Sequence, residues 1–115
     1  MKVSPLVDAE MNSYLGDLLA HTRRSDDAEP YLKKALELDP NSSMAHNSMG
    51  MVKMHQRKFE EAKTHLEKAI SGDSKNHLAY YNYAYVLSRE GRDEFGYVKT
   101  FAKEKAQQMR DALSK

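Results

Sequence analysis

The chain has 115 residues, with 18 Lys and Arg against 17 Asp and Glu, and it contains no cysteine. This balance argues against a nucleic-acid binder, and the lack of cysteine excludes disulfides, Cys-zinc sites and thiol nucleophiles. No stretch approaches the ~18 consecutive apolar residues that a membrane span needs, so no membrane partner is expected, and the compartment is left open. With only 5 Gly and 3 Pro, the composition predicts an all-α fold with short connections.

Two helical runs follow a short lead-in, residues 1–8, which lacks the apolar centre of a secretory signal. From residue 9, apolar residues recur at steps of three and four, first around Leu15 and then around Leu32. The second run ends at Asp39-Pro40, because proline disfavours helical geometry in the residue before it. The spacing predicts a helical hairpin over residues 9–42.

The same layout returns over residues 43–76, shifted by 34 residues. The coinciding positions are small or apolar in both periods: Gly16 with Gly50, Ala28 with Ala62, and Leu32 with Leu66. Small residues let two helices cross closely, and Gly72 suits the left-handed position that follows a helix. Self-similarity at one period indicates a helical repeat.

The third unit, residues 77–115, departs from this pattern. In strict register, the packing positions of its second helix hold Thr100 and Lys103, yet the run from Met109 to Leu113 copies the run from Leu32 to Leu36. We therefore predict an inserted loop near 91–101 in an atypical, truncated third repeat. Whether the aromatic residues of that loop pack locally or touch a ligand is left open.

The repeat resembles the tetratricopeptide repeat (TPR), whose pattern is W-x2-L-G-x2-Y, then A-x3-F, then P. The first unit reads Asn12-x2-Leu15-Gly16-x2-Leu19, Ala28-x3-Leu32 and Pro40. The resemblance implies a TPR helix-turn-helix solenoid, a right-handed superhelix of about six helices. It also implies that the first helix of each pair lines a concave groove, which takes a protein or peptide partner.

The positions that face the groove in the family carry tyrosine, methionine, asparagine and charged side chains. Those singled out as peptide-binding are Tyr14, Asp17, His21, Asn47, Met51, Met54, His55, Tyr81, Asn82, Tyr85 and Arg89. Tyrosine gives rigid contact area, methionine adapts to its ligand, and asparagine matches a peptide backbone. The alternative is that some of these side chains pack between repeats. Tyr80 and Tyr83 are assigned to the core.

No catalytic, metal or cofactor site is expected. His21 and His55 share one repeat position and should be neighbours, but a zinc site needs three or four such ligands. A Gly-rich phosphate loop is lacking, and nothing singles out a catalytic triad. The family's carboxylate clamp is also not expected, because its basic positions here hold residues such as Ser13, Asp17 and Leu78.

The expected function is a non-enzymatic protein-interaction scaffold that binds an extended peptide or partner helix in the concave groove. The alternative is a structural, docking or self-associating TPR segment of a larger protein. The end of the chain resembles the TPR regions attached to bacterial peptidase-like proteins. Self-association would then run through the truncated third repeat.

Overall fold

A computed structural model describes the backbone of residues 4–114 and the side chains of residues 4–92 and 103–114. These residues form five α-helices and no strand, so the predicted all-α fold is confirmed. The helices are α1 (Pro5–His21), α2 (Ser25–Leu38), α3 (Ser43–His55), α4 (Phe59–Gly72) and α5 (His77–Leu113).

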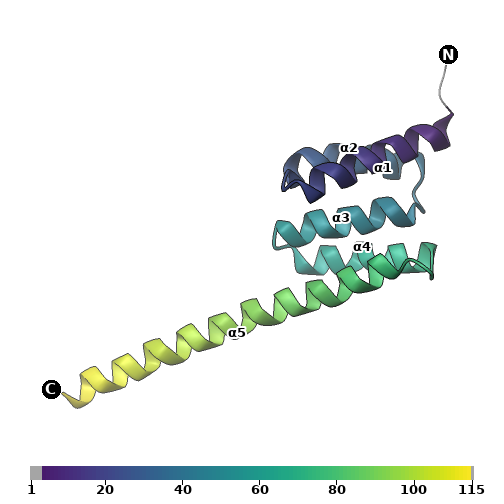
Figure 1. Cartoon of the computed structure of the whole chain (residues 1–115). Coiled ribbons are helices and arrows are strands. Elements are labelled where there is room, and N and C mark those ends of the chain that lie inside the picture. Colours follow the sequence, from purple (N-terminus) through teal and green to yellow (C-terminus); the bar gives the residue numbers. More distant parts are fainter. Residues whose placement is uncertain (1–3, 115) are drawn as a thin grey trace.

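The helices are arranged in two layers. α1 pairs with α2 and α3 pairs with α4, and the two hairpins lie side by side, with α5 against the second (Figure 1). α3 contacts both α1 and α5, so these three helices form one layer, and α2 and α4 lie behind it. The first helices of successive units therefore share a face.

The two kinds of helix begin in different ways. α1, α3 and α5 start at Ser4, Ser42 and Asn76, whose side chains each accept a hydrogen bond from the backbone N–H three residues on. α2 and α4 have no such cap and follow Arg23 and Arg57, which have positive φ angles of 61° and 62°. The left-handed residues thus lie inside each hairpin.

Gly72 does not have the left-handed role that its place in the sequence suggested. It is the last residue of α4, and no glycine of the described residues has a positive φ angle. A Cβ there would lie 3.0 Å from the backbone oxygen of Asn41, so glycine allows α4 to approach the loop before α3.

Close helix crossings hold each hairpin together. A Cβ built on Gly16 would lie 2.6 Å from Leu32 Cγ, and one on Gly50 would lie 2.7 Å from Leu66 Cγ. Both leucines are fully buried, each in its own core cluster. The small residues predicted at the crossings therefore do what the sequence pattern indicated.

α5 is one continuous helix of 37 residues, so the predicted loop near 91–101 is wrong. Strict register would place Thr100 where Leu32 and Leu66 are buried in the first two hairpins. A second helix with Thr100 and Lys103 at its packing positions would bury little apolar surface, so nothing offsets the cost of ordering a turn. The helix continues instead, and five helices are found where about six were expected.

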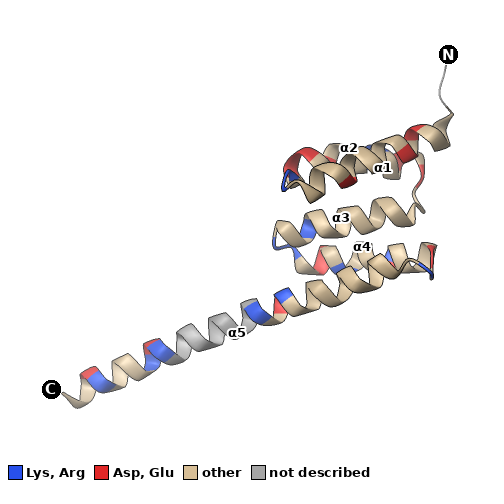
Figure 2. Cartoon of the chain, viewed as in Figure 1, with Lys and Arg blue, Asp and Glu red and all other residues tan. Residues whose placement is uncertain are grey.

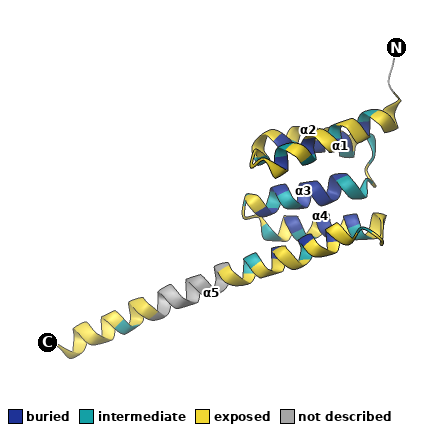
Figure 3. Cartoon of the chain, viewed as in Figure 1, coloured by how far each residue is buried: buried dark blue, intermediate teal, exposed yellow. Residues whose placement is uncertain are grey.

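The continuous helix leaves one face of α5 uncovered. Ala84, the equivalent of Gly16 and Gly50, is exposed, so no helix of the described residues covers it as α2 and α4 cover the glycines. Most of the described side chains of α5 are exposed (Figure 3). Tyr80, assigned to the core from the sequence, is 48% exposed, whereas Tyr83 is half-buried against the second core cluster. The side chains of Phe95, Tyr97 and Phe101 lie outside the described residues.

The molecule is elongated, with extents of 80 × 27 × 19 Å, because the end of α5 projects from the body (Figure 1). Among the described residues, we find no helix whose length and apolar character would let it span a bilayer.

Candidate functional site

The predicted groove residues come from the three helices of one layer, but the structure divides them by exposure. The exposed ones are Tyr14, His21, His55, Tyr81 and Tyr85, the half-buried ones are Asp17, Met51 and Arg89, and the buried ones are Asn47, Met54 and Asn82. The exposed side chains, together with half-buried Met51 and Arg89, are accessible from solvent. The buried ones hold the layer together.

Hydrogen bonds fasten neighbouring helices of this layer. Nδ2 of Asn82 donates to Oδ1 of Asn47 over 2.9 Å, which joins α5 to α3. The hydroxyl of Ser48 donates to Oδ1 of Asp17 over 2.9 Å, which joins α3 to α1. The expectation that Asn47 and Asn82 are both free to match a peptide backbone is therefore wrong, because they are 5% and 6% exposed and bond each other.

Asp17 also contacts a histidine. Nδ1 of His21 lies 3.3 Å from Oδ1 of Asp17 and 2.8 Å from its backbone oxygen, one helical turn away. The carboxylate of Asp17 thus contacts both His21 in the last turn of α1 and Ser48 on α3. It stabilises the layer rather than standing free.

A pocket of about 910 Å³ opens where the turns of the two hairpins meet α5. Its lining includes four predicted groove residues, Met54, His55, Tyr85 and Arg89. The remaining lining residues come from the hairpin turns and the starts of α2 and α4: Arg23, Arg24, Ser25, Asp26, Asp27, Gln56, Arg57 and Phe59. We call this site the turn-end pocket.

Sequence reasoning missed the turn residues of this pocket because it followed helical periodicity, which ends where the turns begin. The signal that could have found them is the repeat itself, since Arg23 and Arg57 are one period apart, as are Arg24 and Lys58. Lysine and arginine therefore recur at the same end of both hairpins (Figure 2).

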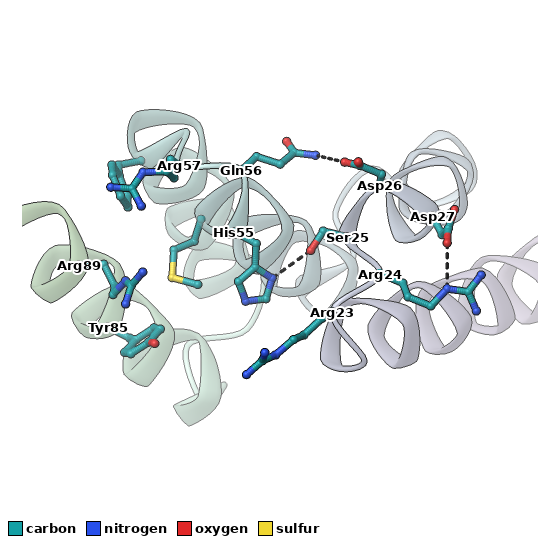
Figure 4. Close-up of a pocket in the computed structure, with 12 residues that line it drawn as sticks. Arg23, Arg24, Ser25, Asp26, Asp27, His55, Gln56, Arg57, Tyr85 and Arg89 are labelled. Atoms are coloured by element: carbon teal, nitrogen blue, oxygen red, sulfur yellow. Dashed lines mark hydrogen bonds and ion pairs between the residues drawn. The ribbon is translucent and has the colours of Figure 1, made fainter. Parts of the chain in front are cut away.

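His55 stands at the centre of the turn-end pocket. Its Nδ1 lies 3.0 Å from the hydroxyl of Ser25, a contact that joins α3 to the start of α2 (Figure 4). Desolvation lowers the pKa of His55, and the nearby charges of His21, Arg23 and Arg89 lower the pKa further. His21 and His55 are thus electrostatic neighbours, as their shared repeat position predicted.

A second hollow, of about 620 Å³, lies between α3 of this layer and α2 and α4 of the other. Nζ of Lys53 lies 2.7 Å from Oε1 of Glu29 there, and the bond lowers the pKa of Glu29. His65 lines the same hollow, and burial lowers its pKa to about 4. Glu29 thus joins α2 to α3, and His65 joins α4 to α3.

Metal chemistry finds no support in the part of the chain that the structure describes. No group of three His, Cys, Asp or Glu side chains there could hold a metal ion. The closest histidines, His46 and His65, have their Nδ1 atoms 3.1 Å apart, and Nε2 of His46 lies 2.8 Å from the backbone oxygen of Pro40. This pair, which sequence reasoning missed, links α3 to α4.

Two matches to protein-family models identify the repeat family of this chain. Residues 9–42 match one tetratricopeptide repeat model, and residues 31–64 match a second tetratricopeptide repeat model. The chain is a tetratricopeptide repeat protein. A search of curated proteins found no match.

Tetratricopeptide repeats are protein-interaction modules and are typically non-catalytic. In this TPR protein, the matched residues cover most of α1, all of α2 and α3, and the start of α4. They include both hairpin turns, and hence most of the wall of the turn-end pocket.

Proposed function

We propose that this TPR protein binds an extended peptide or a partner helix on the face formed by α1, α3 and α5. The observation that carries the proposal is the turn-end pocket, whose wall combines Met54 and His55 of α3 with Tyr85 and Arg89 of α5. A concave site built from two repeats lets one ligand contact both at once.

Exposed tyrosines on the same layer extend this contact surface. Tyr14 is 62% exposed, Tyr81 is 68% exposed and Tyr85 is 37% exposed. Tyrosine supplies large, rigid contact area at a small cost in side-chain entropy. Half-buried Met51 adds a flexible apolar surface that can adjust to different side chains.

The test is a titration of the isotope-labelled protein with a pool of extended peptides, followed by amide NMR spectra. We expect shifts on α1, α3 and α5 around Tyr14, Met51 and Tyr85. Tyr85→Ala should weaken binding about tenfold, as is usual for an aromatic anchor.

The matched control is Tyr31→Ala. Tyr31 is 39% exposed, close to the exposure of Tyr85, but it lies on α2 in the other layer. Its loss should leave binding unchanged. Shifts confined to α2 and α4, or equal losses in both variants, would reject the proposed face.

The uncovered face of α5 favours a second candidate function, self-association with a second copy of the chain. Ala84 is exposed there, between Tyr80 and Leu87, which are 48% and 46% exposed. In the first two hairpins, this face of the first helix is covered by the second helix. A helix from another copy, or from a neighbouring domain of a larger protein, would complete the same packing.

The molar mass in solution as a function of protein concentration tests self-association. We expect the mass to rise for the native chain and to stay that of a monomer for Ala84→Arg, which places a charge on the uncovered face. Leu6→Arg is the control, because Leu6 is 60% exposed on α1. A native chain that stays monomeric at high concentration would reject this candidate.

A further inference from the structure

The turn-end pocket has an excess of positive charge, which bears on what its ligand must be. Four arginines line it, against two aspartates. Both aspartates already have partners: Oδ2 of Asp27 lies 2.9 Å from Nε of Arg24, and Oδ1 of Asp26 accepts a hydrogen bond from Gln56. Arg24 offsets the charge of Asp27, and the four arginines and two aspartates together leave the lining with a net charge of +2.

Two cations in the pocket have no carboxylate partner among the residues whose side chains the structure describes. Among the described residues, neither Arg23 nor Arg89 forms an ion pair, although one lies in the first hairpin turn and the other on α5. Figure 4 shows both guanidinium groups directed toward the space around His55 and Tyr85. The charges of both lower the pKa of His55, after the larger effect of its desolvation.

The backbone holds Arg23 in place at some cost. Its φ angle of 61° lies in the left-handed region, where residues other than glycine are uncommon. Its backbone N–H bonds to the carbonyl of Ala20, which closes the end of α1. This turn fixes the backbone from which the Arg23 side chain extends toward the pocket.

His55 and Tyr85 supply neutral hydrogen-bond donors beside these cations. When Nδ1 of neutral His55 accepts the Ser25 hydroxyl, its proton sits on Nε2, the nitrogen turned away from Ser25 (Figure 4). The phenol of Tyr85 can donate as well. Two cations and two donors from two helices and a turn suit an oxyanion that carries full charge.

We propose that the turn-end pocket binds the carboxylates of an acidic segment of the partner protein, through Arg23 and Arg89 with His55 and Tyr85 as further donors. This inference rests on the proposed function and names the chemistry of its partner. Asp17, which is bonded to Ser48 on the same layer, is outside the pocket lining. Because Asp17 is negative, a carboxylate is attracted not to the middle of the face but to the arginines at its turn end. The acidic part of the segment lies there, and its apolar part lies toward Tyr81 and Tyr14.

The probes are three fluorescein-labelled peptides of one design. The first alternates glutamate with leucine, the second has glutamine for every glutamate, and the third has phosphoserine for every glutamate. The proteins are the native chain, the double variant Arg23→Gln with Arg89→Gln, and a control that loses the same charge elsewhere, Lys75→Gln with Arg110→Gln. Lys75 lies in the turn between α4 and α5, and Arg110 near the end of α5.

We expect the native chain and the control to prefer the glutamate peptide over the glutamine peptide by about tenfold or more, with a preference that salt weakens. The Arg23 and Arg89 double variant should bind both peptides alike. A preference that survives in the double variant, the absence of any preference in the native chain, or binding of the phosphoserine peptide alone would each overturn the inference.

The same data separate this inference from the proposed function. If the native chain bound the glutamate and glutamine peptides equally, and Tyr85→Ala but not Tyr31→Ala weakened binding, the binding face of α1, α3 and α5 would be supported. The inference that its ligand is acidic would then be rejected. If the double variant lost its preference for the glutamate peptide but Tyr85→Ala did not weaken binding, the anion site would be supported. The proposal that the ligand also binds along the face of α1, α3 and α5 would then be rejected.

Discussion

Asn82 donates a hydrogen bond from Nδ2 to Oδ1 of Asn47 over 2.9 Å, and both side chains are buried between α5 and α3. This bond fastens the last helix to the second hairpin. We expect Asn82→Ala to lower the free energy of unfolding by about 1–3 kcal/mol, because it leaves the oxygen of Asn47 buried without a donor. Urea unfolding followed by circular dichroism measures the loss.

The double variant of Asn47→Ala and Asn82→Ala separates the bond from the rest of each side chain. Its cost should be smaller than the sum of the two single costs, because the second truncation removes a group that is already unpaired. Strictly additive costs would mean that the two amides do not interact in solution.

Gly50 lies where a side chain has no room. A Cβ would come within 2.7 Å of Leu66 Cγ and 3.2 Å of the backbone oxygen of Ala62. We expect Gly50→Ala to lower the free energy of unfolding by about 1 kcal/mol, because overpacking outweighs the better helix propensity of alanine. The melting temperature shows the sign.

Gly91 is the matched control on α5. It has no neighbour within 4 Å of a built Cβ, so only helix propensity changes there. Gly91→Ala should leave stability unchanged or raise it by up to about 1 kcal/mol. If Gly50→Ala behaved in the same way, the two helices of the second hairpin would have to lie farther apart than the structure places them.

The ion pair of Lys53 and Glu29 is largely shielded from solvent, with side chains 13% and 19% exposed. Hydrogen bonds from Lys53 and then Gln56 lower the pKa of Glu29. Its contribution is therefore present above the ordinary carboxyl pKa and is lost as the pH falls through the lowered one. We expect Glu29→Gln to cost about 1–2 kcal/mol near neutral pH in urea unfolding.

A surface pair on the same helix provides the comparison. Lys34 and Glu37 lie 3.8 Å apart with side chains 53% and 71% exposed, so solvent screens their attraction. Glu37→Gln should change stability by less than about 0.5 kcal/mol. Equal costs for the two variants would show that the pair at Glu29 is no better shielded than a surface pair.

His65 makes the fold sensitive to acid. Burial first, and then the charges of His46, Lys68 and Lys53, lower its pKa from 6.5 to about 4, while Glu61 acts in the opposite direction. Between these values the unfolded chain binds more protons than the folded chain, so stability falls as the pH drops from 6.5 toward 4. After allowance for partial exposure, we expect a loss of about 1–2 kcal/mol from this group.

His65→Gln removes the titration but keeps a donor for Nδ1 of His46. Urea unfolding of both proteins near neutral pH and at mildly acidic pH compares their slopes. We expect the variant to lose less stability on acidification than the native chain. Parallel pH profiles would assign the acid sensitivity to other groups.

The paired hairpins could be predicted from the sequence because burial repeats with a fixed period. Leu32 and Leu66 lie over Gly16 and Gly50 as the pattern indicated. The end of the third unit could not be predicted, because the copy of the packing pattern near Met109 suggested a hairpin. Local sequence similarity carries no information on whether a helix has a surface to pack on, and Met109 is 67% exposed.

The candidate site was predicted in its helices but not in its turns. The repeat positions identified Tyr85 and Arg89, whereas Arg23 lies where no helical period applies. The pairing of Asn47 with Asn82 was also missed, because a polar residue at a groove position is equally suited to a ligand and to the neighbouring repeat. Only the distance between helices decides between these roles.

α5 is about 55 Å long at 1.5 Å per residue, yet only its first part lies against other helices. Val86 is fully buried, whereas residues 103–114 include no buried side chain. A helical segment of about 12 residues without packing is marginal in water, so the two ends of α5 should differ widely in the protection of their amides from hydrogen exchange. α5 is therefore a single element in its geometry but two elements in its local stability.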